Sequence, residues 1–156
     1  MIPIQSSGLP TLEIDFILLD FEGTVASDRR VHPKVKDKIN LLSKRAKIYV
    51  LARGEKEAGE EVLRNVKAET VFFKEPTVSR EKLDFIRRLG PERTVAVGNG
   101  VDDALIIGEA ALGICIMSKE GTSAETLRQA DLIFSNILDA LDFLLKPLRQ
   151  ATTLGL

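Results

Sequence analysis

The sequence alternates short apolar runs with amphipathic segments of helical period, and this order constrains the fold more than any other feature. The run "LEIDFILLD" at 12–20 becomes continuously apolar at "FILL", as expected of a strand buried on both faces. The segment 32–45 that follows has Val35, Ile39 and Leu42 at helical spacing. Parallel strands joined by helices bury both faces of their sheet. We therefore predict an α/β fold of three layers, with a mainly parallel, Rossmann-like sheet between helices.

The same alternation continues through the rest of the chain. It predicts further strands at 47–52, 69–73, 93–100, 112–117 and 131–134. It predicts further helices at 55–66, 78–89, 101–111, 123–130 and 135–145. The joints are short, and no repeat, low-complexity segment or long linker interrupts them. We therefore predict a single domain over residues 1–156.

The composition indicates a soluble globular protein with a substantial apolar core. Apolar residues make up 44% of the chain and charged residues 29%, as is typical of folded domains. The 22 lysines and arginines nearly cancel the 23 aspartates and glutamates, and no basic stripe is present. We therefore expect no nucleic-acid partner. Because no apolar run approaches the roughly 18 residues of a membrane span, we expect no membrane association.

Targeting signals and sulfur chemistry are also constrained by the sequence. The segment "MIPIQSSGLP" has neither a cationic start nor a long apolar run, so we expect no secretory signal and a cytoplasmic location. A single cysteine excludes an internal disulfide, and with a single histidine the chain cannot build a Cys/His zinc site alone. We predict that Cys115 is a buried core thiol.

Polar side chains collect where the predicted strands end. They are Asp20 and Glu22 after the first strand, Arg53 after the second, and Asn99, Asp102 and Asp103 after the fourth. In open parallel sheets, ligands bind beyond the carboxyl ends of the strands. We therefore expect the functional site at this edge.

The chemistry that suits these residues is phosphoryl transfer with a divalent cation. If the turns after Asp20 and before Asp103 are neighbours, their carboxylates repel one another unless a proton or a cation intervenes. Oxygen ligands without histidine or cysteine favour a hard ion such as Mg²⁺. An aspartate can also act as a nucleophile toward a phosphoryl group, and a cation must then neutralise the transferring oxygens. Lys82 is the best-placed candidate, and Lys74 is its rival.

Several motifs resemble the haloacid dehalogenase (HAD) superfamily, and most closely its small soluble P-type-ATPase-like members. The resemblance covers essentially the whole chain, with the motifs in the family's order. The matching stretches are "LDFEGTVASDR", "VLARGE", "KLDFIRRLG", "VAVGNGVDD", "AALGICI", "GTSAETL" and "ILDALDFLLKPLRQATTL". The resemblance implies a minimal HAD core with no large cap domain.

The resemblance also implies roles for individual residues. Asp20 would be the nucleophile and a ligand of Mg²⁺. The backbone carbonyl of Glu22 and the carboxylate of Asp103 would also hold the metal, and Lys82 would pair with Asp20 and the phosphoryl oxygens. Gly98 and Gly100 would let the backbone turn tightly beside the site, and we predict three substrate-binding residues: Arg53, Asn99 and Thr24.

Two positions depart from the family pattern. Most phosphatases of the superfamily carry an aspartate where Glu22 stands, as general acid and base. We predict that Glu22 takes this catalytic role, with a turn residue that faces solvent as the alternative, and its extra methylene moves the carboxyl group by about 1.5 Å. The second strand of these proteins usually ends in a serine or threonine that hydrogen-bonds the phosphoryl group. Ala52 stands at that place here, and losing such a donor typically costs about 10²-fold in rate.

Three functions are compatible with this pattern. The first is magnesium-dependent hydrolysis of a small phosphomonoester through an aspartyl-phosphate on Asp20, with reduced activity as a possible consequence of Glu22 and Ala52. The second is a degenerate module that binds magnesium and phosphate as a binding or oligomeric scaffold. The third is a module that is phosphorylated and releases phosphate slowly. The apolar segment "ILDALDFLLKPL" is compatible with a homo-oligomer as well as with core packing.

Overall fold

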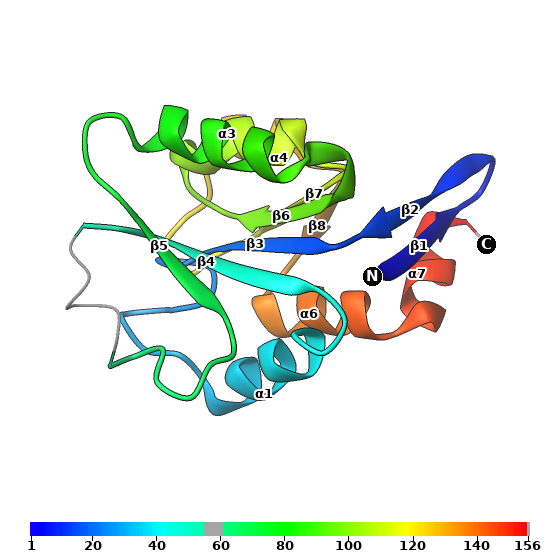
Figure 1. Ribbon diagram of the computed structural model, residues 1–156, viewed down its shortest axis with the longest axis horizontal. Coiled ribbons are helices and arrows are strands. Elements are labelled where there is room, and N and C mark those ends of the chain that lie inside the picture. Colours follow the sequence, from blue (N-terminus) through cyan, green and yellow to red (C-terminus); the bar gives the residue numbers. More distant parts are fainter. Residues whose placement is uncertain (55–60, 156) are drawn as a thin grey trace.

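The computed structural model describes residues 1–54 and 61–155, and its centre is a sheet of six parallel strands (Figure 1). In spatial order the strands are β5 (Glu69–Phe73), β4 (Lys47–Arg53), β3 (Phe16–Asp20), β6 (Thr94–Gly98), β7 (Leu112–Ile116) and β8 (Leu132–Phe134). β3 is central, with β4 on one side and β6 on the other. The chain builds outward from β3 in one direction and then from β6 in the other. A topological switch point therefore lies between β3 and β6, where open α/β sheets bind their ligands.

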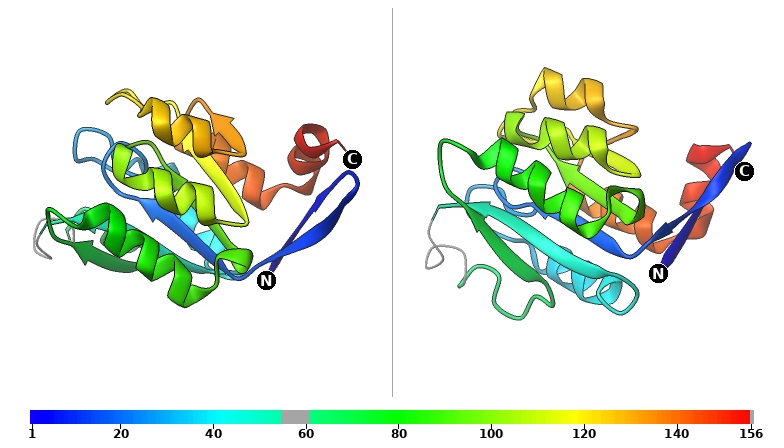
Figure 2. Two further views of the ribbon diagram at one scale, coloured as in Figure 1. Left: turned by 90° about the horizontal axis from the view of Figure 1, so that it is seen from above. Right: turned by 45° about the horizontal axis from the view of Figure 1, so that its top comes forward.

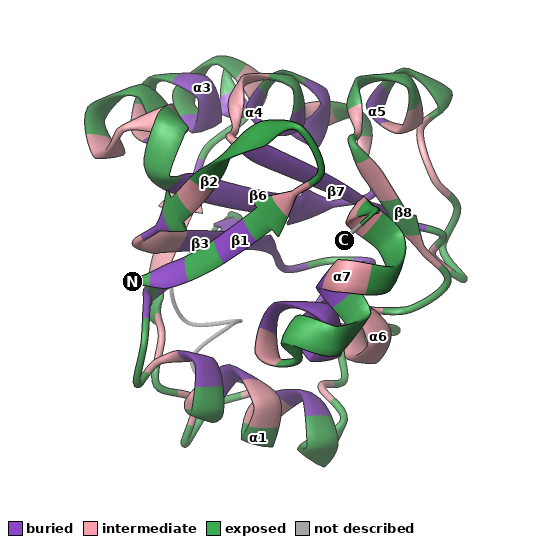
Figure 3. Ribbon diagram, turned by 90° about the vertical axis from the view of Figure 1, so that its right-hand side faces the viewer, coloured by how far each residue is buried: buried purple, intermediate pink, exposed green. Residues whose placement is uncertain are grey.

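Helices cover both faces of this sheet, which confirms the predicted three-layer α/β fold (Figures 1 and 3). One face carries α1 (Pro33–Leu42) and α6 (Ile137–Leu145). The other carries α3 (Val78–Leu89), α4 (Ala104–Glu109) and α5 (Ala124–Gln129). Two short 3₁₀ helices, η1 (Pro91–Arg93) and η2 (Val101–Asp103), lead into β6 and α4. Within the described ranges, no helix is long and apolar enough to cross a membrane.

Successive residues of β3 face opposite layers of the molecule. Ile17 and Leu19 belong to the core cluster that includes Ile39 of α1, whereas Leu18 belongs to the cluster that includes Ile86 of α3. All five are completely buried. Each such side chain stabilises the fold by about 2 kcal/mol through burial. The unbroken apolar run that ends at Asp20 is therefore explained by a strand with two buried faces.

The described residues, 1–54 and 61–155, contain no large cap domain, as predicted. The two connections that leave the sheet beside Asp20 are residues 21–32 after β3 and residues 54–68 after β4. Both are far shorter than the roughly 50 residues that a domain needs. Neither connection is therefore long enough to form a cap domain.

The prediction of one strand over 12–20 is wrong, because the chain divides at Asp15. β2 (Leu9–Ile14) pairs antiparallel with β1 (Ile2–Ser6) in a hairpin that extends beyond the amino ends of the main sheet (Figure 2). At Asp15 the backbone amide still donates to the carbonyl of Arg93 at 2.9 Å, and the carbonyl accepts from the first residue of β4. The strands β4 and β6 begin opposite Phe16, so residues before Asp15 have no neighbouring strand in the main sheet. β2 therefore pairs with β1 instead.

The sequence pattern also gives no indication of α7 (Pro147–Leu154), which packs against this hairpin. The amide of Ser7 donates to the carbonyl of Leu154 at 3.1 Å. The buried side chain of Gln150 donates through Nε2 to the carbonyl of Phe143 at 2.8 Å. Both the hairpin and α7 depend on contacts between the two ends of the chain, which local periodicity does not register.

The other predicted helices are present with small differences in their bounds, but the helix predicted at 55–66 is not confirmed. α3 occupies 78–89 as predicted. The predicted helix 101–111 begins as η2 and continues as α4. For the predicted helix 55–66, residues 55–60 lie outside the described residues, and residues 61–65 form turns.

Candidate active site

Two carboxylates meet at the carboxyl edge of the sheet because β3 and β6 are neighbours. Asp20 is the last residue of β3, and Asp103 is the last residue of η2, shortly after β6. The register pairs Leu19 with Val97, so the two strands end side by side. Both carboxylates are buried, Asp20 with 7% and Asp103 with 1% of their surface exposed.

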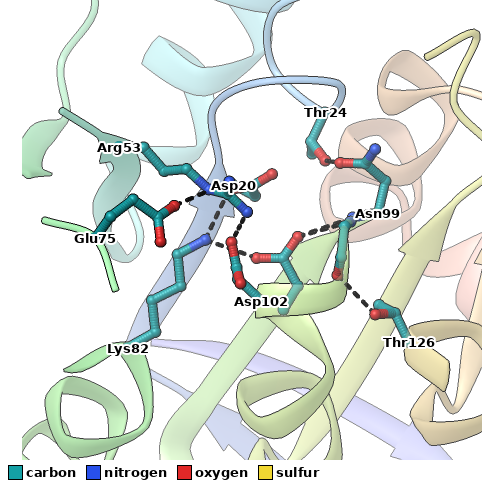
Figure 4. A network of polar contacts seen from close by, with 10 residues as sticks. Asp20, Thr24, Arg53, Glu75, Lys82, Asn99, Asp102 and Thr126 are labelled. Carbon is teal, nitrogen blue, oxygen red and sulfur yellow. Dashed lines mark hydrogen bonds and ion pairs between the residues drawn. The ribbon is translucent and has the colours of Figure 1, made fainter. Parts of the chain in front are cut away.

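Lys82 from α3 lies between these two carboxylates (Figure 4). Its Nζ donates to Oδ1 of Asp20 and to Oδ1 of Asp103, both at 2.8 Å, and the residue is 1% exposed. Lys74, the rival candidate, is exposed and does not line the cavity described below. The structure therefore brings together Asp20, Lys82 and Asp103, three of the predicted site residues.

The burial of these charges shifts their proton affinities. Burial raises the pKa of Asp20 well above its usual range, and the charges of Asp103 and Glu22 raise it further, whereas Lys82 opposes this shift. Burial alone would lower the pKa of Lys82, but the two carboxylates outweigh burial and raise it. The group holds two carboxylates and one ammonium. When both carboxylates are ionised, the group has an excess of negative charge, which favours a further cation.

The second oxygen of Asp103 is fixed by the backbone of the turn after β6. Its Oδ2 accepts from the amides of Asn99 at 3.1 Å and Gly100 at 3.0 Å. The preceding glycine makes this approach possible, since a Cβ atom on Gly98 would lie 2.4 Å from Oδ2 of Asp103. The proposed tight-turn role of Gly98 therefore has a specific cause, which is room for a carboxylate.

The side chain of Asn99 joins three segments at the site. Its Oδ1 accepts from the hydroxyl of Thr24 at 3.1 Å, and its Nδ2 donates to the carbonyl of Gly121 at 3.0 Å. Gly23, with φ of 79°, leaves room for this amide, because a Cβ there would lie 2.5 Å from Nδ2. Thr24 is buried and does not line the cavity described below.

A cavity of about 330 Å³ opens above these groups. Its lining includes every predicted catalytic, metal-binding and substrate-binding residue except Thr24. The full lining is Asp20, Glu22, Arg53, Lys82, Asn99, Gly100, Asp102 and Asp103. Glu22 is exposed, so it lies at the rim, and its charge reaches Asp20. Ala52 packs in the core on the side of α1 and α6 and offers no hydroxyl to the cavity.

Asp102 is the site residue that the sequence interpretation left without a role. It forms an ion pair with Arg53, which also pairs with Glu75 at 3.2 Å (Figure 4). The sequence signal was present in the doublet Asp102–Asp103, since adjacent side chains at the start of a helix point in different directions. Only the structure shows that one aspartate meets Lys82 and the other meets Arg53.

The donor set around Asp20 fits a hard divalent ion better than a softer metal. The available atoms are carboxylate and carbonyl oxygens, which is the ligand chemistry of Mg²⁺. In the described part of the chain, no group of three or more His, Cys, Asp or Glu side chains is arranged to hold a metal without other ligands. A magnesium ion here would therefore take backbone, solvent or substrate oxygens in addition to the carboxylates.

Comparisons with known sequences give two relatives of undescribed activity. No family model matches the chain. It is similar to uncharacterized protein MJ0073 of Methanocaldococcus jannaschii, 36% identical over 72 residues that make up 46% of this chain and 77% of that protein. It is also similar to uncharacterized protein MJ0072 of the same organism, 44% identical over 36 residues, or 23% of this chain and 82% of that protein.

Solved structures give longer matches at lower identity. One, described as a HAD family hydrolase from Streptomyces avermitilis, has a TM-score of 0.68 at 20% identity and covers 90% of this chain and 94% of its own. Another is 3-deoxy-D-manno-octulosonate 8-phosphate phosphatase from Moraxella catarrhalis with magnesium, phosphate and KDO, with a TM-score of 0.66 at 12% identity over 87% and 88%. A third is the cobalt-bound YrbI phosphatase from Haemophilus influenzae, with a TM-score of 0.67 at 14% identity over 85% and 88%.

These likenesses concern the fold, because the identities are low. The three structures are named as a hydrolase and two phosphatases, and none is a P-type ATPase. The closer resemblance to soluble P-type-ATPase-like proteins therefore gains no support from them.

Proposed function

We propose that this chain, which has the fold of the HAD superfamily hydrolases, is a magnesium-dependent phosphohydrolase that acts on phosphomonoesters through an aspartyl-phosphate on Asp20. The observation that carries the proposal is the buried Lys82, bonded to Asp20 and Asp103 at 2.8 Å beneath an open cavity. Burying three charges at the carboxyl ends of the strands costs free energy, which a merely structural contact does not need. Such a cluster is typical of a catalytic site.

In the first step an oxygen of Asp20 attacks the phosphorus of the ester. The bond from phosphorus to the ester oxygen breaks, and the leaving alkoxide takes a proton from the carboxyl group of Glu22. Lys82 orients Asp20 through Oδ1 and stabilises negative charge on the transferring oxygens. The acyl phosphate then stands on Asp20.

In the second step water attacks the phosphorus of that intermediate. Glu22, now ionised, accepts a proton from the water, and the bond from phosphorus to Asp20 breaks. Inorganic phosphate leaves and Asp20 is regenerated. The rim position of Glu22 suits both transfers, because it lines the same cavity as Asp20 and is exposed to solvent.

Magnesium would be held by the carboxylate of Asp20, the backbone carbonyl of Glu22 and the carboxylate of Asp103. The carboxylate of Asp103 has about four acceptor positions. Lys82, Asn99 and Gly100 use three of them, which leaves one on Oδ1 for the metal. When bound, the ion supplies positive charge that offsets the phosphate and the carboxylates.

The proposed substrate is a small phosphorylated molecule, with Arg53 and Asn99 as its binding residues at the cavity. The phosphatase from Moraxella catarrhalis, which shares the fold, holds magnesium, phosphate and a sugar acid. Because no cap domain covers the site in the part of the chain that the structure describes, the part of the substrate beyond its phosphate would lie largely in solvent.

Hydrolysis of p-nitrophenyl phosphate with and without magnesium tests the proposal, on the native chain and on Asp20→Asn. We expect magnesium-dependent turnover in the native chain and a loss of at least about 10³-fold in the variant, since the nucleophile is removed. Equal turnover in both proteins would contradict the proposal.

A second candidate function is a catalytically degenerate module that binds magnesium and phosphate. Ala52 favours it, because it offers no hydroxyl at the end of β4. Calorimetry separates the two functions: binding of magnesium and phosphate without turnover would establish the module and exclude the phosphohydrolase.

A further inference from the structure

Arg53 reaches the cavity from the end of β4 and is held between two carboxylates (Figure 4). Its Nη2 pairs with Oδ2 of Asp102, and its Nη1 donates to Oε1 of Glu75 at 3.2 Å. The two partners differ in exposure, because 18% of the Asp102 side chain is exposed but 65% of the Glu75 side chain is. The pair with Asp102 is therefore the more shielded of the two.

Arg53 is one of two cations among the described residues that line the cavity. The other, Lys82, is buried and already donates to two carboxylates. A guanidinium carries five N–H donors in a planar fork. The hydrogen bond to Glu75 uses one donor of Nη1, and the ion pair with Asp102 lies at Nη2. Arg53 therefore keeps free donors for an incoming anion while both ends of its fork are held.

We propose that Asp102 is a positioning residue, which fixes the guanidinium of Arg53 over Asp20 so that Arg53 binds the phosphate in place of the hydroxyl that Ala52 cannot offer. This inference rests on the proposed function and goes beyond it, because it gives a role to a residue that neither the motif nor the comparisons assign. The ordering of a long flexible side chain before binding lowers the entropy lost when the phosphate arrives.

A different role for Asp102 makes the opposite prediction. If Asp102 acts only as a negative charge near the cavity, it repels phosphate, and its removal must tighten phosphate binding. If it positions Arg53, its removal must weaken binding despite the lost repulsion. The sign of the change therefore separates the two roles.

The experiment is a double-mutant cycle with inorganic phosphate as the probe. Isothermal titration calorimetry in the presence of magnesium measures the phosphate affinity of each protein. The proteins are the native chain, Arg53→Ala, Asp102→Asn and the double variant. We expect Asp102→Asn to weaken phosphate binding about five-fold and Arg53→Ala to weaken it about ten-fold. In the Arg53→Ala background, Asp102→Asn should leave the affinity unchanged or raise it, because only repulsion remains.

Glu75→Gln is the matched control, since it removes one negative charge from the same guanidinium at the exposed end. We expect it to change phosphate affinity less than two-fold, as is usual for exposed ion pairs. With p-nitrophenyl phosphate, Asp102→Asn should raise KM and leave kcat within about two-fold, because the interaction acts on binding.

The proposal is overturned if Asp102→Asn, introduced alone, tightens phosphate binding or leaves it unchanged, or if Arg53→Ala leaves phosphate affinity unchanged. Native protein without measurable phosphate affinity would overturn it too. The proposed function is judged separately, by whether magnesium-dependent turnover disappears in Asp20→Asn. Thermal melts of all variants show whether any lost affinity reflects lost folding.

Discussion

Asp103 shows how much of this site depends on the space around single side chains. Its two oxygens accept from Lys82 and from two backbone amides, and it is 1% exposed. A buried carboxylate is stable only when such partners satisfy it. The glycine that leaves room for it is therefore as important to the site as the carboxylate.

We predict that Gly98→Ala lowers both stability and activity. Its Cβ would lie 2.4 Å from Oδ2 of Asp103, so the carboxylate must leave its backbone donors. Uncoupling a buried charge from its hydrogen bonds costs about 3 kcal/mol in the free energy of unfolding. Urea denaturation measures this loss, and p-nitrophenyl phosphate turnover should fall by about 10²-fold.

Gly100→Ala is the control for this change. A Cβ on Gly100 meets Oδ2 of Asp103 at 3.7 Å, an ordinary contact, and its φ of −88° suits any residue. We expect its free energy of unfolding to stay within about 1 kcal/mol of the native value. Equal losses in the two variants would show that turn flexibility, and not room for Asp103, is what matters.

At the residue scale, the sequence allowed Asp20, Lys82 and Asp103 to be placed together, because strand ends and motif order define a common edge. It did not distinguish the directions of Asp102 and Asp103, which depend on the turn of η2. It also did not show that the hydroxyl of Thr24, a predicted substrate-binding residue, donates to Asn99. Such partners are set by distances between loops, which sequence spacing does not give.

At the scale of elements, α1 and α6 are joined by a cluster of charges around Asp142. Lys38 of α1 donates to Oδ1 of Asp142, and Lys146 donates to Oδ2 at 3.2 Å. Arg149 lies within 3.6 Å of the same Oδ2. The hydrogen bond from Lys38 is the main cause that lowers the pKa of Asp142 below its usual range.

We predict that this cluster makes stability depend on pH. Because the pKa of Asp142 is lower in the folded than in the unfolded chain, its contribution is present above about pH 4 and is lost as pH falls through the folded pKa. Asp142→Asn should lower the free energy of unfolding by about 1 kcal/mol at pH 7. Urea denaturation from pH 7 to pH 3 measures the difference between the two proteins.

The difference should shrink as the pH falls, because the native carboxylate becomes protonated. A difference that stays constant from pH 7 to pH 3 would mean that packing, and not charge, accounts for the effect of the substitution. Asp139→Asn is a suitable control, since Asp139 lies on the same helix with 47% of its side chain exposed. We expect it to change stability by less than about 0.5 kcal/mol.

Elements whose apolar residues follow a clear period were predicted well from the sequence, and those formed by distant contacts were not. α3 has its predicted bounds because one face of the helix is apolar and Gly90-Pro91 ends it. The β1–β2 hairpin and α7 were missed because each is stabilised by the other, at opposite ends of the chain. Asp15 separates β2 from β3 because the chain passes there from the hairpin to the main sheet. Nothing in the local sequence indicates this division.

At the scale of the whole molecule, the hairpin and the candidate site lie at opposite ends of the central sheet. Asp20 stands at the carboxyl end of β3, whereas β2 joins β3 at its amino end (Figure 1). Ile4 of the hairpin is 1% exposed and belongs to the core cluster shared with α1 and α6. Substitutions in the hairpin should therefore change stability and leave turnover unchanged.

We predict that Ile4→Ala lowers the melting temperature and leaves kcat/KM unchanged at temperatures where the protein is folded. Removing a buried isoleucine side chain costs about 2–4 kcal/mol. Leu9→Ala, at a position with 68% of its surface exposed, should change neither quantity. Differential scanning calorimetry and p-nitrophenyl phosphate assays at 25 °C measure both. A loss of kcat/KM in folded Ile4→Ala would show that the two ends are coupled.

The three charged residues of the site are synthesised at different times, because they lie far apart in the sequence. Asp20 and Lys82 are 62 residues apart, and Lys82 and Asp103 are a further 21 residues apart. Because chains emerge from the ribosome with the N-terminus first, Asp20 is exposed to the cell long before either partner has been made. A nascent chain that has not reached Asp103 therefore has an unfinished charge cluster. The candidate site can therefore form only after residue 103 has been synthesised.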